Sequence, residues 1–118
     1  MYYADKIKQK NRYSDIRAFK HSRVHLIPRD RFTSGDAEVN GYINANFVDG
    51  PIGLNDRKII ACQGPLENTY TDFWRMVSQE NVTLIVTTCK EVENGRHKCH
   101  KFWPSDVGDM EFQSDERF

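Results

Sequence analysis

Residues 93–104 read Glu-Asn-Gly-Arg-His-Lys-Cys-His-Lys-Phe-Trp-Pro. An Asn-Gly pair between alternating polar and apolar residues is a strong short-range signal for a two-residue β-hairpin turn. Such a hairpin would hold Glu93 and Lys98 on two short strands beside the turn. Trp103-Pro104 would end the pairing, because proline has no backbone N–H to donate. The stretch therefore predicts antiparallel β-structure in the second half of the chain.

The composition is that of one globular unit or a piece of one, with 118 residues of which 38% are hydrophobic and 29% charged. No apolar run approaches the ~20 residues of a membrane span, and the first residues lack the apolar core of a secretory signal. Three cysteines without a repeated spacing do not predict a disulfide framework. We therefore expect a cytoplasmic or other intracellular, reducing setting and no membrane span.

Charge is balanced overall but not along the chain. Residues 1–31 carry nine Lys or Arg and three Asp, and the remaining residues carry the compensating excess of acid. This basic stretch is either an ordinary solvated surface or a rim that attracts an anionic ligand such as a phosphorylated peptide. Because no nucleic-acid-binding module accompanies it, no nucleic-acid partner is expected.

The pattern of apolar residues predicts both strands and helices. We expect a helix or arm at 1–10, a loop at 33–41, strands at 23–27, 42–48, 58–62 and 82–88, and further alternation at 108–113. In the helix predicted at 68–79, an apolar stripe recurs at helical spacing, and Asn68 is the expected N-cap. The stripe consists of Tyr70, Phe73, Trp74 and Val77. This order predicts a mixed α and β (α/β) fold on a twisted, mostly antiparallel sheet, which one amphipathic helix covers incompletely.

Six short motifs extend through residues 10–104. They are Lys10-Asn11-Arg12-Tyr13-Ser14-Asp15, His21-Ser22-Arg23-Val24, Tyr42-Ile43-Asn44-Ala45, Gln63-Gly64-Pro65-Leu66, Asp72-Phe73-Trp74-Arg75-Met76-Val77 and Lys98-Cys99-His100-Lys101-Phe102-Trp103-Pro104. In this order and spacing they resemble the amino-terminal half of a tyrosine-specific, cysteine-dependent protein phosphatase domain. The resemblance implies that residues 1–118 are a truncated amino-terminal portion of one such domain, with 1–10 leading and 11–118 phosphatase-like.

The resemblance assigns substrate binding to two residues. Tyr13 matches the tyrosine that stacks on the phosphotyrosine ring and sets the depth of the pocket, which favours a long aryl phosphate over the shorter phosphoserine. Asp15 matches the acid that accepts hydrogen bonds from the peptide backbone of the substrate. The plainer alternatives are a surface tyrosine in a turn and an Asx-turn residue.

Five further residues match positions that support the site. Arg12 is expected to fix its loop through an ion pair, Asn44 to tie the Tyr13 loop to the sheet as a buried amide, and Gln63 to lie near the pocket floor. Glu93 resembles the carboxylate that orients a phosphate-binding arginine, and Lys98 the lysine that contacts a mobile acid loop. Without the resemblance, Glu93 and Lys98 would be interpreted as a cross-hairpin surface pair.

The catalytic part of the family pattern has no match. No cysteine has an arginine six residues on, where Asn68, Gly95 and Ser105 stand instead, so no catalytic residue is expected in this chain. All three cysteines are expected to be small buried hydrophobes. A cluster of Cys89, His97, Cys99 and His100 lacks the paired spacing of zinc sites, so neither a metal nor an organic cofactor is expected.

These observations predict the function at the level of the parent domain. We expect hydrolysis of phosphotyrosine in proteins through a cysteinyl-phosphate intermediate, with a phosphotyrosine-containing protein or peptide as partner and the remainder of the domain required for activity. Two alternatives remain, a non-catalytic phosphotyrosine-binding or interaction module and a fragment without independent function.

Overall fold

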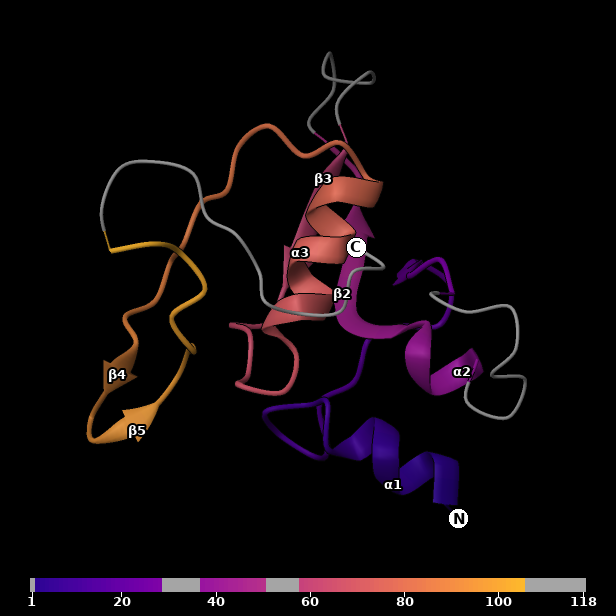
Figure 1. The fold of residues 1–118 in the computed structure, drawn as a ribbon, viewed down its shortest axis with the longest axis horizontal. Coiled ribbons are helices and arrows are strands. Elements are labelled where there is room, and N and C mark those ends of the chain that lie inside the picture. The colour runs from indigo at the N-terminus through magenta and orange to yellow at the C-terminus, as the bar shows by residue number, and fades with distance from the viewer. Residues whose placement is uncertain (1, 29–36, 51–57, 106–118) are drawn as a thin grey trace.

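The computed structural model describes residues 2–28, 37–50 and 58–105. Its elements follow the order α1 (Tyr2–Lys8), β1 (Arg23–His25), α2 (Ala37–Asn40), β2 (Tyr42–Val48), β3 (Ile59–Cys62), α3 (Tyr70–Gln79), β4 (Val92–Glu93) and β5 (Arg96–His97) (Figure 1). The mixed α and β class is confirmed. The alternation predicted at 108–113 and the first part of the loop predicted at 33–41 lie outside the described residues. Residues 37–40 of that loop form the short helix α2 instead.

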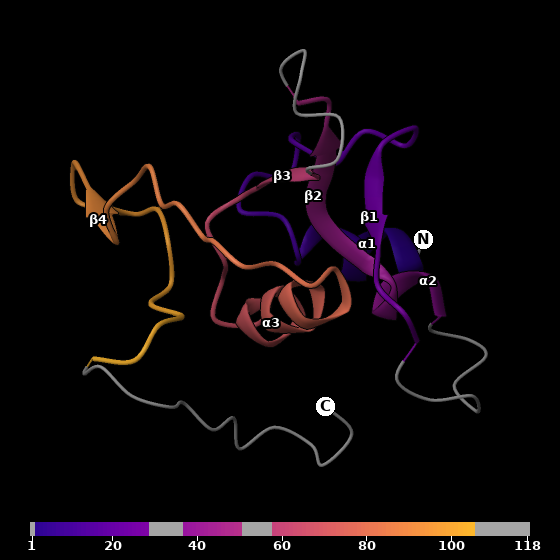
Figure 2. The ribbon, with the colours of Figure 1, turned by 90° about the horizontal axis from the view of Figure 1, so that it is seen from above.

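The larger sheet has three antiparallel strands in the order β1-β2-β3. The strand predicted at 42–48 has the bounds of β2. Its pattern was readable from the sequence because alternate residues along it point to the two faces of the sheet. Ile43 and Ala45 are buried in the same cluster as Phe73 and Met76 of α3. Figure 2 shows α3 lying along one side of this sheet.

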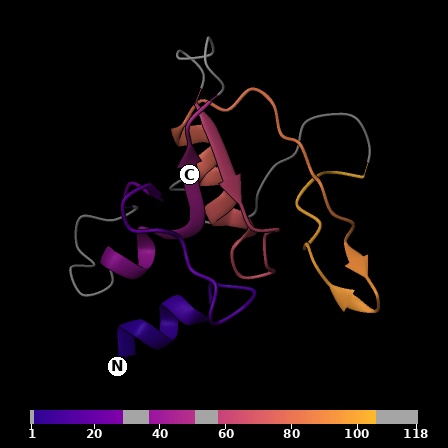
Figure 3. The ribbon, with the colours of Figure 1, turned by 180° about the vertical axis from the view of Figure 1, so that it is seen from behind.

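The second face of β2 is covered by an irregular segment of the chain rather than by a helix. Tyr42, Asn44 and Asn46 alternate on that face, and all three hydrogen-bond to the segment 11–22. Figure 3, seen from behind, shows this segment crossing the sheet on the side away from α3. The incomplete helical cover was predicted correctly, but the polar cover of the opposite face was not predicted.

Helix α3 begins later than expected, and its predicted N-cap is wrong. Thr69 holds the cap position without a side-chain capping hydrogen bond, because its Oγ1 accepts from the backbone N–H of Leu66 at 2.8 Å. Asn68 instead donates to the carbonyl of Gln9 at 3.1 Å. The predicted apolar stripe does face the core, where Phe73 is buried and the other members of the stripe are partly buried.

The predicted hairpin is present, whereas the predicted strand at 82–88 is not. Asn94 and Gly95 have φ values of 53° and 73°, the left-handed pair that a tight two-residue turn requires. Residues 82–88 form no strand, and Leu84 and Val86 are 76% and 73% exposed. A strand needs hydrogen-bonding partners on at least one edge, and nothing in the described part of the chain pairs with this segment. No helix among the described residues is long and apolar enough to cross a membrane.

Candidate functional site

The segment that begins at Asn11 is anchored by side-chain amides. Asn11 is 6% exposed, and its Oδ1 accepts from Tyr42 Oη at 2.7 Å and from Asn44 Nδ2 at 3.0 Å. Asn44 Nδ2 also donates to the carbonyl of Ile16 at 2.9 Å. Asn44 is only partly buried, but its amide joins both ends of the turn at 11–16 to β2.

Gln63, at the end of β3, completes this amide network. Its Oε1 accepts from the backbone N–H of Arg12 at 3.0 Å and from Asn44 Nδ2 at 3.3 Å, while its Nε2 donates to the carbonyl of Lys10 at 2.7 Å. An amide can donate and accept at once. One side chain therefore binds the backbone of the neighbouring segment at two positions, Lys10 and Arg12.

Arg12 fixes the loop, but not through the ion pair that the sequence predicted. Its guanidinium donates to the carbonyls of His97, Gly64 and Pro65 at 2.9, 3.2 and 3.0 Å. Its fork of donors matches several acceptors at once, so Nη1 and Nη2 bind backbone oxygens where a carboxylate was expected, while Nε is buried without a hydrogen-bond partner among the described residues. Arg12 therefore connects the Tyr13 loop to both the turn after β3 and the last residue of β5.

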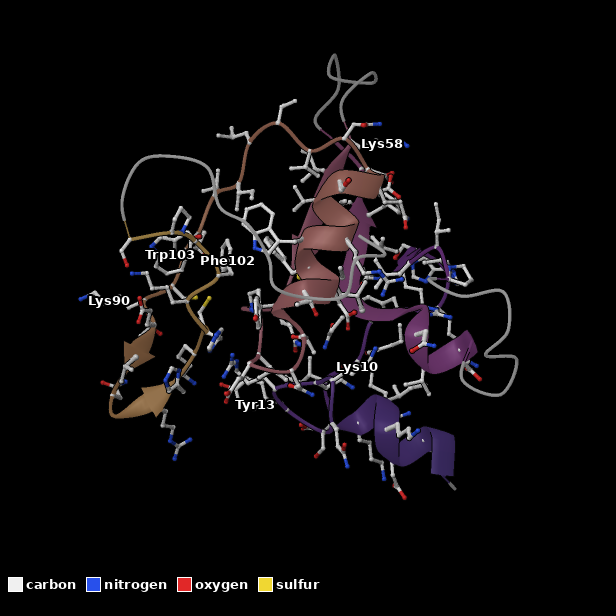
Figure 4. All side chains as sticks on the ribbon, in the orientation of Figure 1. Lys10, Tyr13, Lys58, Lys90, Phe102 and Trp103 are labelled. Carbon is white, nitrogen blue, oxygen red and sulfur yellow. The ribbon has the colours of Figure 1, made fainter. Side chains whose placement is uncertain are left out.

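Tyr13 faces the hairpin region across a shallow space, and Figure 4 shows its position beside the N-terminal segment. The side chain is 43% exposed. Lys98 Nζ donates to Tyr13 Oη at 2.5 Å and lies 5.2 Å from the centre of the ring. A cation over an aromatic face is an attractive arrangement. Lys98 thus fixes the Tyr13 ring from the side of the hairpin region.

Around this space, the fold brings together six of the seven predicted site residues in one depression of about 410 Å³. Its lining comprises Arg12, Tyr13, Ile16, Asn44, Gln63, Gly64, Cys89, Glu93 and Lys98. Asp15 does not line it, although its side chain is exposed two residues beyond Tyr13. The lining combines an aromatic wall, neutral amides, a lysine and a carboxylate, a set suited to an aryl ligand with a charged end.

Glu93 and Lys98 do not oppose each other across the hairpin. The register pairs Glu93 with Arg96 and Val92 with His97, and the Glu93 carboxylate accepts from the backbone N–H of Lys90 at 3.3 Å. Lys98 reaches Tyr13 instead. The simple surface pair is therefore wrong, and both side chains remain at the depression.

Gly64 belongs to the motif Gln63-Gly64-Pro65-Leu66, but the sequence predicts no role for it. A Cβ at this position would overlap the carbonyl oxygen of Lys98 and come within 3.0 Å of the Cβ of Cys99. The missing side chain lets two backbones touch, and His100 donates to the carbonyl of Pro65 at 2.7 Å beside this point. A glycine between a strand and a proline was the available signal, but sequence alone does not show what approaches it.

Two of the three cysteines have the environment expected of inert thiols. Burial raises the pKa of Cys62 to about 12, and burial also raises the pKa of Cys99, which is 1% exposed. A thiol must ionise to act as a nucleophile, so neither is prepared for attack on phosphate. The prediction of three buried cysteines holds only for Cys99, because Cys62 and Cys89 are both partly buried, and Cys89 also lines the depression.

Comparison with known families agrees with this geometry. The protein-tyrosine phosphatase family matches residues 7–116. The chain belongs to that family. Groups of three His, Cys, Asp or Glu that could hold a metal ion are absent from the described ranges.

Among its relatives is human tyrosine-protein phosphatase non-receptor type 12, which is 48% identical over 96 residues, 81% of this chain and 11% of the relative. Rat receptor-type tyrosine-protein phosphatase zeta is 46% identical over 107 residues, 91% of this chain and 4% of the relative. Tyrosine-protein phosphatase 99A of Drosophila melanogaster is 46% identical over 99 residues, 84% of this chain and 7% of the relative. The chain therefore spans about a tenth or less of the length of these relatives.

Proposed function

We propose that this chain supplies the phosphotyrosine-recognition face of a protein-tyrosine phosphatase domain. The parent domain would hydrolyse phosphotyrosine in proteins through a cysteinyl-phosphate intermediate. The observation that carries the proposal is the position of Tyr13, an exposed ring at the edge of a depression, held in place by Lys98 and by an anchored loop. A rigid aromatic wall with a cation beside it suits an aryl phosphate.

The proposed roles follow the positions of the side chains. Tyr13 would stack on the phosphotyrosine ring, and Asp15, exposed beside it, would accept hydrogen bonds from the peptide backbone of the substrate. Gln63 and Asn44 would keep the loop at its height above the sheet. Glu93 and Lys98 would meet residues of the catalytic half of the domain, an arginine and an acid loop respectively. The proposed setting is intracellular, which three free thiols support.

The chemistry would come from residues outside this sequence. The nucleophile of such an enzyme needs a lowered thiol pKa and a cradle of backbone N–H groups, and no Cys-x5-Arg pattern occurs in the 118 residues. The isolated chain should therefore not hydrolyse an aryl phosphate, measured as phosphate release by highly purified material. Turnover that disappears in Cys89→Ser would contradict this expectation and would make Cys89 a nucleophile.

The recognition role is tested in a phosphatase domain that contains this segment. Tyr13→Ala should lower kcat/KM for phosphotyrosine peptides by ~1–3 kcal/mol in transition-state terms. It should lower the free energy of unfolding by no more than ~1 kcal/mol, because the side chain is exposed. Matched phosphoserine peptides should stay poor substrates for both proteins.

Phe19→Ala is the matched control for this experiment. Phe19 is an aromatic residue on the same segment, is 68% exposed and lies outside the lining of the depression. Its removal should leave kcat/KM for phosphotyrosine peptides unchanged. An unchanged rate in Tyr13→Ala together with a sharply lowered melting temperature would make Tyr13 a packing residue and would refute the proposed role.

A further inference from the structure

The tip of the hairpin places an asparagine side chain beside an unhindered backbone nitrogen. Asn94 and Gly95 are both exposed, and a Cβ added at Gly95 would meet no atom within 4 Å. Figure 1 shows the tip of β4 and β5 at the edge of the molecule. Within the described ranges, neither the Asn94 side-chain amide nor the Gly95 N–H has a hydrogen-bond partner. The Gly95 nitrogen is therefore free to attack the side-chain carbonyl carbon of Asn94, and water can reach the product.

The backbone conformation of Asn94 favours this attack. Its φ of 53° is close to that of the first central residue in both type I′ and type II′ turns, which differ in the orientation of the central peptide group. A five-membered ring between the Asn94 side chain and the Gly95 nitrogen brings ψ of Asn94 close to the type II′ value of about −120°. Rotation of one peptide group reaches this value, because glycine tolerates either sign of φ.

The chain contains a second Asn-Gly pair, Asn40-Gly41, which the fold holds differently. Asn40 is the last residue of α2 and has no left-handed φ, and a helical ψ lies far from the value that the ring requires. The carbonyl of Asn40 accepts from Arg75 Nη1 at 3.4 Å, and that of Gly41 accepts from the Leu26 N–H at 3.0 Å. Rotation of the peptide group at this pair would first have to break these contacts.

We propose that Asn94 is a site of spontaneous deamidation and that the fold protects Asn40 from the same reaction. The Gly95 nitrogen attacks Cγ of Asn94, the N–Cγ bond forms and the Cγ–Nδ2 bond breaks. Nδ2 leaves as ammonia with the proton that the Gly95 nitrogen has lost. Water then adds to one of the two Asn94 carbonyl carbons of the cyclic imide. Opening at one carbon gives aspartate and opening at the other gives isoaspartate, without an oxidant or a reductant.

Both products change the hairpin that carries Glu93 and Lys98 at the depression. Residues 91–98 contain two acidic and two basic side chains, so either product leaves this stretch with a net negative charge. Isoaspartate also places one extra carbon in the backbone of a two-residue loop. Because β4 and β5 are joined by the pairs Val92–His97 and Glu93–Arg96, their alignment depends on the turn that this carbon distorts.

The experiment incubates the 118-residue chain in mildly alkaline buffer and follows it by ion exchange and by mass spectrometry of tryptic peptides. Asn94 is the only asparagine of peptide 91–96, whereas Asn40 lies in peptide 32–57 and is located there by fragmentation. In the folded chain, Asn94 should deamidate at least about tenfold faster than Asn40, because Asn40 must first leave its hydrogen bonds. The product at residue 94 should comprise aspartate and isoaspartate peptides of equal mass and different retention times.

The two Asn-Gly pairs control for each other. In guanidinium chloride both pairs lose the surrounding structure, so their two rates should become similar. In the folded chain, Asn94→Gln should remove the early product of more negative charge, and Asn40→Gln should leave it. The proposal is overturned if Asn94 is as slow as Asn40 in the folded chain, if denaturant does not reduce the ratio of the two rates, or if aspartate forms at residue 94 without isoaspartate.

Discussion

The segment 11–22 and the segment 82–88 both run beside the core without being regular strands, yet they differ in what holds them. The first is tied to β2 and to the residue after β3 by amide side chains. Asn44 and Asn46 each make more than one hydrogen bond to it, and Gln63 binds the backbone of Arg12 and that of Lys10 just before the segment. The second has the strongest β-forming sequence of the chain, yet it forms no strand, and its apolar side chains are exposed. The intrinsic β-propensity of a segment therefore matters less here than a neighbouring chain at hydrogen-bonding distance.

Gly64 lies against the backbone of Lys98 and Cys99 and accepts a hydrogen bond from Arg12 of the anchored segment, so changing it should have the largest effect. Gly64→Ala should lower the free energy of unfolding by about 3 kcal/mol, because the added carbon meets a backbone carbonyl that cannot rotate away. Gly95→Ala is the control, since Gly95 has a left-handed φ but open space around it and should cost only about 1 kcal/mol. Denaturant unfolding of both variants measures the difference, and equal losses would show that the close approach is not tight.

The difference between the two segments predicts unequal losses of unfolding free energy when a side chain that supports 11–22 or one within 82–88 is truncated to alanine. Asn44→Ala should cost about 1.5–2 kcal/mol of unfolding free energy, because carbonyl and amide oxygens beneath the loop lose their donor. Leu84→Ala, at an exposed position of the unpaired segment, should cost less than ~0.5 kcal/mol. Denaturant unfolding measures both values. If Leu84→Ala proved the more costly change, the segment 82–88 would be packed in solution and the contrast would be wrong.

Cys62 should make the free energy of unfolding depend on alkaline pH. Its pKa rises from 9.0 in the unfolded reference to about 12 in the fold because of burial. Its contribution to stability is complete below pH 9.0 and is lost as pH rises toward 12. Above pH 9.0, the wild type should lose ~1.4 kcal/mol per pH unit more than Cys62→Ala. Parallel stability curves for the two proteins from pH ~8 to ~11 would contradict this.

The sequence predicted those elements whose signal is local. Strand β2 has its predicted bounds because alternation alone defines a two-faced strand, and the hairpin follows from Asn94 and Gly95. The stripe on α3 likewise identified the side that packs on the core. Each of these patterns is complete within a few residues, so it needs no knowledge of the neighbours.

The remaining features depend on which chain lies alongside. The segment 82–88 forms no strand because no described segment pairs with it. Asn68 does not cap α3 because its side chain donates to the carbonyl of Gln9 instead. For the site, the resemblance identified six residues that the fold brings to one depression. It did not show that Arg12 binds three carbonyls, or that Cys89 joins the lining, since both follow from long-range approach of backbones.

The amide network under the Tyr13 loop has one more consequence, which concerns ionic conditions. Asn11, Asn44 and Gln63 carry no formal charge, so the hydrogen bonds that set the height of the loop neither titrate near neutral pH nor weaken through ionic screening. The support that these amides give the loop should then be insensitive to salt concentration, whereas the contacts of the charged Arg12 and Lys98 side chains should respond to it.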